Sequence, residues 1–322
     1  MKREDRLHKK PEPALQGFRV GGGLRNLPHN FGLDLRRNKA LYLFLTVILT
    51  YFILFHYLPM FGIYYSFTKY TIIKDPVWVG LANFEWLFAM PNFWNAFQNT
   101  LELSVVKLLL TTTFSVVLSL LLNEMQNIHG KKLAQTIIYL PHFMSWVVTA
   151  SVFQLILSPA TAGLVNQVLI SLGIVDEGIY FLGSSQWWKS AYYVINIWHD
   201  TGWGTIIFMA TLTSIDPGIY EAASIDGAGR WKKMWYVTLP ALANTIITVL
   251  ILNLAKIMNL FESVFVLQND AVMDVSQVLQ TYVYYQTFNS GGIPDYGYTT
   301  AIGLFRSLVG MALMLICNYA SK

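Results

Sequence analysis

The chain has 322 residues, of which 54% are hydrophobic and only 12% charged, and its net charge is +4. Soluble domains carry about 25% charged residues, so this composition excludes an ordinary soluble protein and indicates lipid as the main solvent. The single cysteine excludes an internal disulfide. The small positive charge gives no reason to expect a nucleic-acid partner.

The first 39 residues form a basic tail with ten Lys and Arg residues. The first apolar run begins only at Ala40 and is too long for the apolar part of a signal peptide, so we expect no cleavable leader. We therefore predict two parts, a cytoplasmic tail at 1–39 and a transmembrane domain at 40–322.

A helix that spans a bilayer needs about 20 mostly apolar residues. Runs of this kind predict an all-α integral membrane protein with six transmembrane helices. They are Ala40–Ile63, Phe97–Leu122, Gln135–Leu157, Ser190–Leu212, Ala241–Glu262 and Tyr298–Tyr319.

The distribution of Lys and Arg predicts the orientation, because cytoplasmic loops carry the excess of these residues. With six spans, both termini lie on one side of the membrane. That side holds the tail and the basic residues Lys131, Lys132, Arg230, Lys232, Lys233 and Lys322. The opposite loops hold only Lys69, Lys74 and Lys189. Both termini are therefore expected in the cytoplasm.

The polar segment 216–240, between the fourth and fifth spans, then lies in the cytoplasm as well. Asp216 is a suitable N-cap, and Pro217 suits the first helical turn, where its missing N–H costs nothing. Asp226-Gly227 ends this helix, because glycine adopts positive φ without strain. The pattern predicts a helix–turn–helix.

The second helix of this segment is predicted to begin at Gly229. Trp231, Met234 and Trp235 have the i, i+3, i+4 spacing of one apolar face. Arg230, Lys232 and Lys233 lie on the other side. An aromatic face on a short helix in water predicts a surface that fits into a partner.

Motifs for catalysis are missing from the sequence. There is no G-x-x-x-x-G-K-[ST] phosphate loop and no G-x-S-x-G nucleophile elbow, and the six histidines lack the spacing of metal ligands. The chain is therefore not expected to be an enzyme. Energy for transport would come from an ion gradient or from another subunit.

The stretch from Glu221 to Pro240, EAASIDGAGRWKKMWYVTLP, resembles the EAA signature of permease subunits in bacterial binding-protein-dependent ABC importers. In that family this loop forms coupling helices that sit in a cleft of the ATPase subunit. The resemblance and the aromatic face together predict a set of residues that couple transport to ATP hydrolysis. They are Glu221, Ala222, Ala223, Asp226, Gly227, Ala228, Arg230, Trp231 and Trp235.

Further motifs resemble the carbohydrate branch of this family, which moves oligosaccharides and polysaccharides. They are WVGLANF at Trp78–Phe84 with Asn99-Thr100 downstream, YLPHFMSW at Tyr139–Trp146, and GLFRS at Gly303–Ser307. The resemblance covers about Leu41 to Lys322.

The family implies several partners and a location. The partners are a second permease that forms a heterodimer with this chain, two ATPase subunits that hold ATP and Mg²⁺, and an extracytoplasmic solute-binding protein. The location is the bacterial inner membrane, where the chain contacts lipid. No cofactor is expected in this chain. Two alternatives remain at this stage: a permease for amino acids or peptides, and a membrane-embedded polysaccharide enzyme that would use His199-Asp200.

The fifth span carries a polar stripe. At 100° per residue, Asn253, Lys256, Asn259, Leu260 and Ser263 fall within an arc of about 120°. Such a stripe can line a sugar path, because amides both donate to and accept from hydroxyls, or it can join helices. Lys256 suits the carboxylate of an acidic oligosaccharide of the alginate kind. An ion pair of Lys256 with Glu262 or Asp200 is the alternative.

The fourth span places Asn196, His199, Asp200 and Trp203 on one face by the same geometry. Hydrogen-bonding groups beside an aromatic ring are typical of sugar sites, but these residues can equally lie in water near the outer surface. Six charged residues lie in the apolar runs, where such residues usually face the interior or a cavity. They are Glu102, Lys107, Asp200, Lys256, Glu262 and Arg306. For Glu102, Glu262 and Arg306, the alternative to lining a cavity is an ion pair with an opposite charge or a position near the membrane interface.

Overall fold

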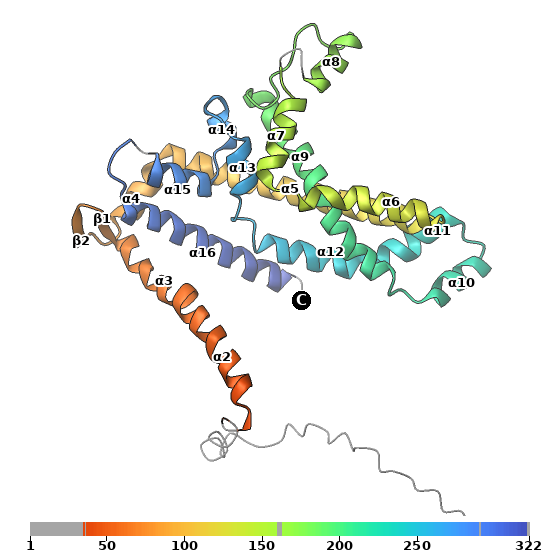
Figure 1. Ribbon diagram of the computed structural model, residues 1–322, viewed down its shortest axis with the longest axis horizontal. Coiled ribbons are helices and arrows are strands. Elements are labelled where there is room, and N and C mark those ends of the chain that lie inside the picture. The colour runs from red at the N-terminus through yellow and green to blue at the C-terminus, as the bar shows by residue number, and fades with distance from the viewer. Residues whose placement is uncertain (1–34, 36, 160–162, 290, 321–322) are drawn as a thin grey trace, which may run out of the picture. The chain divides into compact units, whose positions relative to one another are not determined.

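The computed structural model describes residues 35, 37–159, 163–289 and 291–320. It divides into two units, Met1–Phe61 and Gly62–Lys322. The predicted tail at 1–39 lies almost entirely outside the described residues, so its boundary stays a prediction. Within the described ranges the chain is predominantly helical (Figure 1).

The described part of the first unit is one helical rod. It consists of α2 (Lys39–Phe52), a π-helical turn η2 (Ile53–Tyr57) and α3 (Leu58–Met60). None of these elements buries a side chain. An apolar helix that is exposed on all sides is stable only in contact with lipid or another protein. The rod therefore has the character of a membrane span.

The second unit is built around α5 (Pro91–Glu124) and α9 (Ser185–Leu212), which pack along each other. Helix α12 (Leu239–Leu254) packs against both of these helices and against α16 (Tyr296–Ala320), and Phe305 of α16 contacts Phe93 of α5 (Figure 1). Their buried side chains form three hydrophobic clusters, which centre on Trp188, Phe93 and Phe208.

Smaller elements connect and cover these helices. They are η3 (Phe61–Phe67), the antiparallel hairpin β1 (Thr68–Thr71) and β2 (Lys74–Trp78), α4 (Ala82–Ala89), α8 (Leu164–Ser171), α13 (Glu262–Leu267), η6 (Asp270–Val272), α14 (Met273–Ser276) and α15 (Leu279–Phe288). In Figure 1, α4 and α15 lie at one end of α5, and α10 (Pro217–Ile225) and α11 (Arg230–Lys233) lie beyond its other end.

The predicted third span is not one helix. It is divided into α6 (Ile128–Tyr139), the turn η4 (Leu140–Phe143) and α7 (Trp146–Ile156), with a bend of 104°. Pro141 lies in the turn, and Met144 is extended with ψ 142°. Ser145 then starts α7, since its side chain accepts a hydrogen bond from the Val148 N–H. The expected continuous helix Gln135–Leu157 is therefore wrong.

The predicted fifth span also ends early. Helix α12 stops at Leu254, and residues 255–261 form turns before α13 begins. The arc drawn through Asn253 and Ser263 assumed one continuous helix, so it is wrong. Ser263 is buried elsewhere, where its hydroxyl lies 3.0 Å from the Tyr192 hydroxyl.

The helix that contains α12 begins before Leu239. A π-helical turn, η5 (Met234–Thr238), joins α11 to α12, so Arg230–Leu254 is one helix of 25 residues. Pro240 follows η5 just as Pro59 follows η2, and a wider π turn tolerates the missing proline N–H. The second helix of the predicted helix–turn–helix is therefore continuous with the fifth span.

In the described part of the chain, four helices are long and apolar enough to cross a membrane, or five if the bent pair α6–α7 is one span. Helix α9 is not among them, although it is 28 residues long. Asn196, His199 and Asp200 interrupt the apolar sequence of α9. This interruption accounts for the difference between these candidate spans and the six spans that were predicted. Six spans therefore remain a prediction.

Candidate functional site

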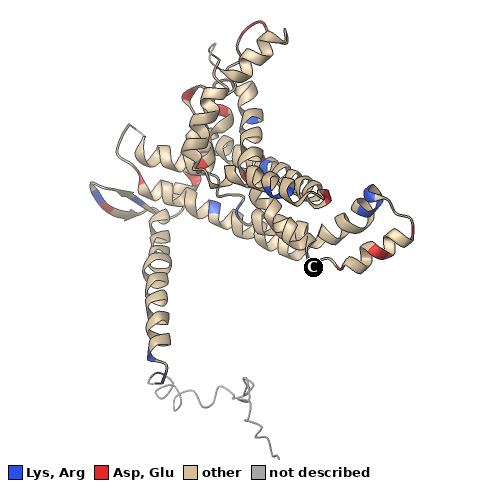
Figure 2. Ribbon diagram, turned by 45° about the vertical axis from the view of Figure 1, so that its right-hand side comes forward, with Lys and Arg blue, Asp and Glu red and all other residues tan. Residues whose placement is uncertain are grey.

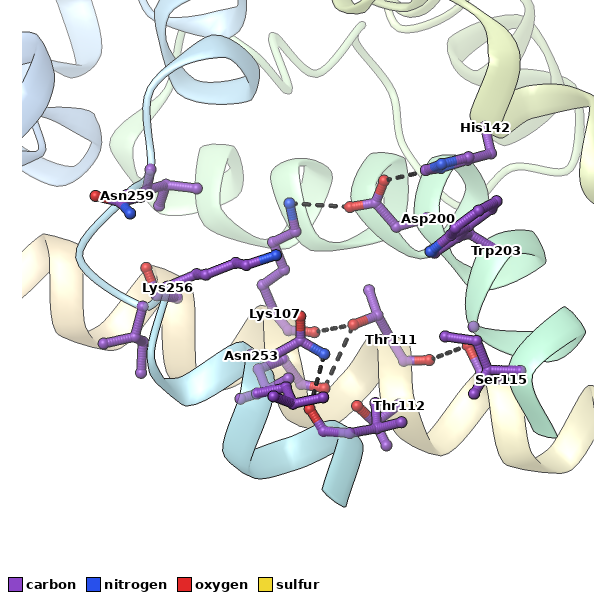
Figure 3. Close-up of a pocket in the computed structure, with 18 of the residues that line it drawn as sticks. Lys107, Thr111, Thr112, Ser115, His142, Asp200, Trp203, Asn253, Lys256 and Asn259 are labelled. Carbon is purple, nitrogen blue, oxygen red and sulfur yellow. Dashed lines mark hydrogen bonds and ion pairs between the residues drawn. The ribbon is translucent and has the colours of Figure 1, made fainter. Parts of the chain in front are cut away.

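A cavity of about 490 Å³ lies among the helices of the second unit. It is bounded by α5, α9, α12 and the turns that follow α12 (Figure 3). Its lining combines polar side chains with apolar ones. The polar residues are Ser104, Lys107, Thr111, Thr112, Ser115, His142, Asp200, Asn253, Lys256 and Asn259, with the indole of Trp203 beside them.

Helix α5 supplies one wall as a stripe of polar residues. Ser104, Lys107, Thr111 and Ser115 recur every three or four residues and therefore share one face. The Ser104 hydroxyl is buried and has no hydrogen-bond partner among the described residues.

Asp200 joins the two central helices. Its Oδ2 lies 2.9 Å from the ammonium of Lys107 in α5, and its Oδ1 lies 2.6 Å from Nδ1 of the neighbouring His199. His199 is almost fully buried, whereas Lys107 and Asp200 are about one quarter exposed and reach the cavity. The ion pair therefore forms part of the cavity wall.

His199 links Asp200 to the residues before α7. Its Nδ1 lies 2.6 Å from Asp200 Oδ1, and its Nε2 lies 3.1 Å from the carbonyl oxygen of Met144. The Asp200 carboxylate is therefore positioned from two sides, by Lys107 of α5 and by the imidazole of its own helix.

Aromatic rings support this cluster. Trp146 stacks on His199 with a centroid distance of 4.1 Å, and Trp203 stacks on His142 at 5.1 Å. The Lys107 ammonium also lies 5.5 Å from the Trp146 ring centroid, within the range of a cation–π contact. Half of Trp203 remains exposed, so its ring is accessible from the cavity.

Lys256 adds a second positive charge. It lies in the turns after α12 and forms no ion pair or hydrogen bond with another side chain in the described ranges. Neither partner considered from the sequence binds it, since Asp200 pairs with Lys107 and Glu262 is exposed at the start of α13. Figure 3 shows both lysine side chains directed into the cavity. With Lys107 paired to Asp200, the lining therefore carries one positive charge in excess, that of Lys256.

A metal ion is the other ligand to consider here. Ligand atoms of His142, His199 and Asp200 lie within 4.8 Å of one another. However, Lys107 is 2.9 Å from the same carboxylate. A second cation beside this ammonium would be repelled, so the cluster is better suited to an anion than to a metal.

Five of the residues predicted for the substrate path line this cavity. They are Asp200, Trp203, Asn253, Lys256 and Asn259. The other two do not: Asn196 is fully buried and donates to the Tyr192 carbonyl of its own helix, and His199 lies behind Asp200.

Sequence reasoning missed the contribution of α5 and of His142. Lys107 stood out only as a charge in an apolar run, and His142 only as part of a motif. The spacing of Ser104, Lys107, Thr111 and Ser115 could have revealed the polar face of α5. Nothing in the sequence pattern pairs Lys107 with Asp200.

The remaining charges of the predicted spans lie outside this cavity. Glu102 pairs with Lys189 at 2.7 Å, again between α5 and α9, and Arg306 is partly buried in α16. These residues therefore do not contribute to the charge of the cavity lining.

The predicted coupling segment has the expected local geometry. Asp216 caps α10 by accepting from the Gly218 N–H, and Gly227 adopts φ 75° in the turn that follows. Trp231 and Trp235 are largely exposed. Figure 2 shows basic residues near these helices and at the start of α6, at the same end of the second unit.

Comparison with known proteins shows the family of the chain. Residues 115–321 match the model of the binding-protein-dependent transport system inner membrane component. Protein LplB of Bacillus subtilis (strain 168) is 40% identical over 89% of this chain and 90% of that protein. The polygalacturonan/rhamnogalacturonan transport system permease protein YteP of the same organism is 39% identical over 90% of each chain.

A solved structure is similar throughout the fold. It is a bacterial ABC transporter involved in the import of the acidic polysaccharide alginate, and one chain of it superposes with a TM-score of 0.82. The two chains are 33% identical, and the match covers 91% of this chain and 98% of the other. The same transporter in complex with alginate pentasaccharide-bound periplasmic protein matches equally well. The chain thus belongs to the family of inner membrane components of binding-protein-dependent transport systems.

Proposed function

We propose that the chain is a permease subunit of an ATP-driven importer of acidic oligosaccharides. The observation that carries this proposal is the positive charge of Lys256, which lines the cavity without an ion-pair partner in the described ranges. A cation in a membrane-embedded site is expensive unless it is paired or used. Carboxylates on the cargo would supply the missing negative charge.

The other lining groups suit a sugar. Amides and hydroxyls both donate to and accept from sugar hydroxyls, and the exposed Trp203 ring can cover an apolar C–H face. The cavity of about 490 Å³ is within the size range of small-ligand sites. A few sugar units would occupy it while the remainder extends along the path.

The relatives support this cargo class. Alginate is described as an acidic polysaccharide, and polygalacturonan is a polymer of a uronic acid. These two relatives are therefore carbohydrate systems with carboxylate-bearing substrates, whereas less similar relatives are named for neutral sugars, among them lactose at 30% identity. This favours an acidic oligosaccharide over the amino-acid or peptide alternative, and membership of a transport family favours transport over catalysis.

The assembly follows from the family. In this proposal the chain pairs with a second permease, and each permease contacts one ATPase subunit that binds ATP and Mg²⁺. A solute-binding protein delivers the cargo from outside. Both termini and the segment 216–240 face the cytoplasm of a bacterial cell, and α10 with α11 transmits the motion of the ATPases.

Purification from the native membrane tests this proposal. We expect an ATPase and a second permease to copurify with the chain in mild detergent. The reconstituted complex with its binding protein should hydrolyse ATP faster when oligouronates are added than when neutral oligosaccharides of equal length are added. Stimulation by neutral sugars alone would reject an acidic cargo, and recovery of the chain without an ATPase would reject the importer.

A further inference from the structure

Asp200 has partners on both sides of its carboxylate. Lys107 contacts Oδ2 from the cavity side at 2.9 Å, and His199 contacts Oδ1 from the protein interior at 2.6 Å. The side chain of His199 is only 5% exposed, whereas that of Lys107 is 22% exposed. A ligand can therefore reach the contact with Lys107 but not the contact with His199.

The two contacts are also independent, because they use different oxygens of the carboxylate. Asp200 keeps its contact with His199 if Lys107 turns to another partner. His142 lies 3.8 Å from Oδ1 of Asp200, and its Nδ1 is buried without a hydrogen-bond partner in the described ranges. The carboxylate is thus held by its own helix through His199.

Lys107 is held less firmly. Apart from Asp200, its ammonium has a cation–π contact with Trp146. Breaking a buried ion pair is costly because it leaves a charge without a partner. If a carboxylate from the cavity takes the position of Asp200, Lys107 gains an equivalent partner and Asp200 keeps its hydrogen bond with His199, so neither group is left without a contact.

We propose that Asp200 is a built-in substitute for the cargo's carboxylate, which replaces Asp200 on Lys107 when an acidic oligosaccharide enters the cavity. This proposal rests on the proposed function and assigns Lys107 and Asp200 as specificity-determining residues. Asp200 competes for Lys107 and so promotes release of the cargo. A neutral sugar offers no charge in exchange, so the ion pair discriminates against it.

The test uses the complete importer with its binding protein in proteoliposomes. The measured quantity is the half-saturating concentration of an oligouronate for uptake, compared with that of its methyl ester, which has the same shape without the charge. Lys107→Gln should raise this value for the oligouronate roughly tenfold, the expected scale for a charge-assisted hydrogen bond. Asp200→Asn should lower it, because the competitor for Lys107 is gone.

The double variant is decisive. Exchange predicts that Lys107→Gln with Asp200→Asn behaves like Lys107→Gln alone, because Asp200 acts only through Lys107. A purely structural ion pair predicts that both single variants weaken uptake and that the double variant recovers it. That second pattern would overturn the proposal.

Glu102→Gln is the matched control. It breaks the ion pair of Glu102 with Lys189, which joins the same two helices at 2.7 Å outside the cavity. The half-saturating concentration of the oligouronate should be the same for this variant as for the wild type. A shift like that of Asp200→Asn would show that any α5–α9 ion pair has this effect, and would overturn the proposal.

If Asp200→Asn does not assemble, Lys107→Gln against Lys107→Arg provides the test. If the cargo carboxylate replaces Asp200 on Lys107, the Lys107→Arg variant should retain uptake of the oligouronate. The Lys107→Gln variant should weaken uptake of the oligouronate without weakening uptake of the methyl ester. Equal loss for both ligands overturns the exchange and leaves an acidic cargo intact. If the wild-type importer carries no oligouronate at all, the cargo proposal fails and the exchange fails with it.

Discussion

Gly202 in α9 lies directly against the backbone of Ile138 in α6. A Cβ at residue 202 would collide with the carbonyl oxygen of Ile138. Gly202 follows Asp200 by two residues, and Ile138 precedes His142 by one helical turn. This close approach therefore sets the distance between the two elements that supply Asp200 and His142 to the cavity.

Gly202→Ala should destabilise the protein, because the added methyl group forces α6 and α9 apart. Overpacking of this kind costs about 1–3 kcal/mol. The measurement is the melting temperature of the purified importer in detergent. Gly310→Ala in α16 is the control, since a Cβ there meets no atom within 4 Å. Equal melting temperatures for the two variants would contradict the prediction.

Lys256→Gln should weaken uptake of acidic oligosaccharides, because it removes a cation without an ion-pair partner in the described part of the chain. Hydrogen bonds to charged groups contribute about 1.5–3 kcal/mol, so the half-saturating concentration should rise at least tenfold. Lys256→Arg should retain most of the affinity. Unchanged uptake of every acidic oligosaccharide by Lys256→Gln would remove this residue from the substrate path.

Trp203→Ala should weaken binding of charged and neutral sugars alike, since the indole contributes a stacking surface and no charge. Aromatic contacts are worth about 0.5–1.5 kcal/mol beyond area burial, which corresponds to a rise of roughly twofold to tenfold in half-saturating concentration. Trp203→Phe keeps a ring against His142 and should lie between the alanine variant and the wild type. An effect confined to acidic sugars would argue against stacking.

Gly227→Val should uncouple ATP hydrolysis from transport, because a β-branched residue is strained at φ 75°. Glu221→Lys should also disturb docking, while membrane insertion of both variants stays normal. The measurement is cargo-stimulated ATPase activity of the reconstituted importer. Gly229→Ala is the control, with φ −69° and open space around its Cβ. Wild-type stimulation in both variants would remove the basis for assigning this segment to coupling.

Asn166→Ala should loosen the segment around α8. The Asn166 side chain is buried, donates to the carbonyls of Ser158 and Ile179, and accepts from the Ile179 N–H. Leaving these buried backbone groups unpaired costs about 1–3 kcal/mol each. Limited proteolysis should cut this region faster than in the wild type. Val168→Ala, which shortens an exposed side chain of α8, should not change the cleavage rate.

Membrane character, family and cargo class could be predicted from the sequence, because each depends on local information. Composition and run length reveal a lipid-embedded chain, and the motif from Glu221 to Pro240 is contiguous. The cap at Asp216 and the turn at Gly227 were also predictable, since backbone preferences of single residues decide them. For Lys256, the sequence left a choice between the cavity and an ion pair.

Tertiary structure alone decided where the spans break and which charges meet. Apolar composition is similar in a straight helix and a broken one, so neither the bend between α6 and α7 nor the end of α12 at Leu254 was visible in it. The pairing of Lys107 with Asp200 joins helices far apart in the chain. Periodicity orders residues within one helix, but only packing determines which faces of different helices enclose a cavity.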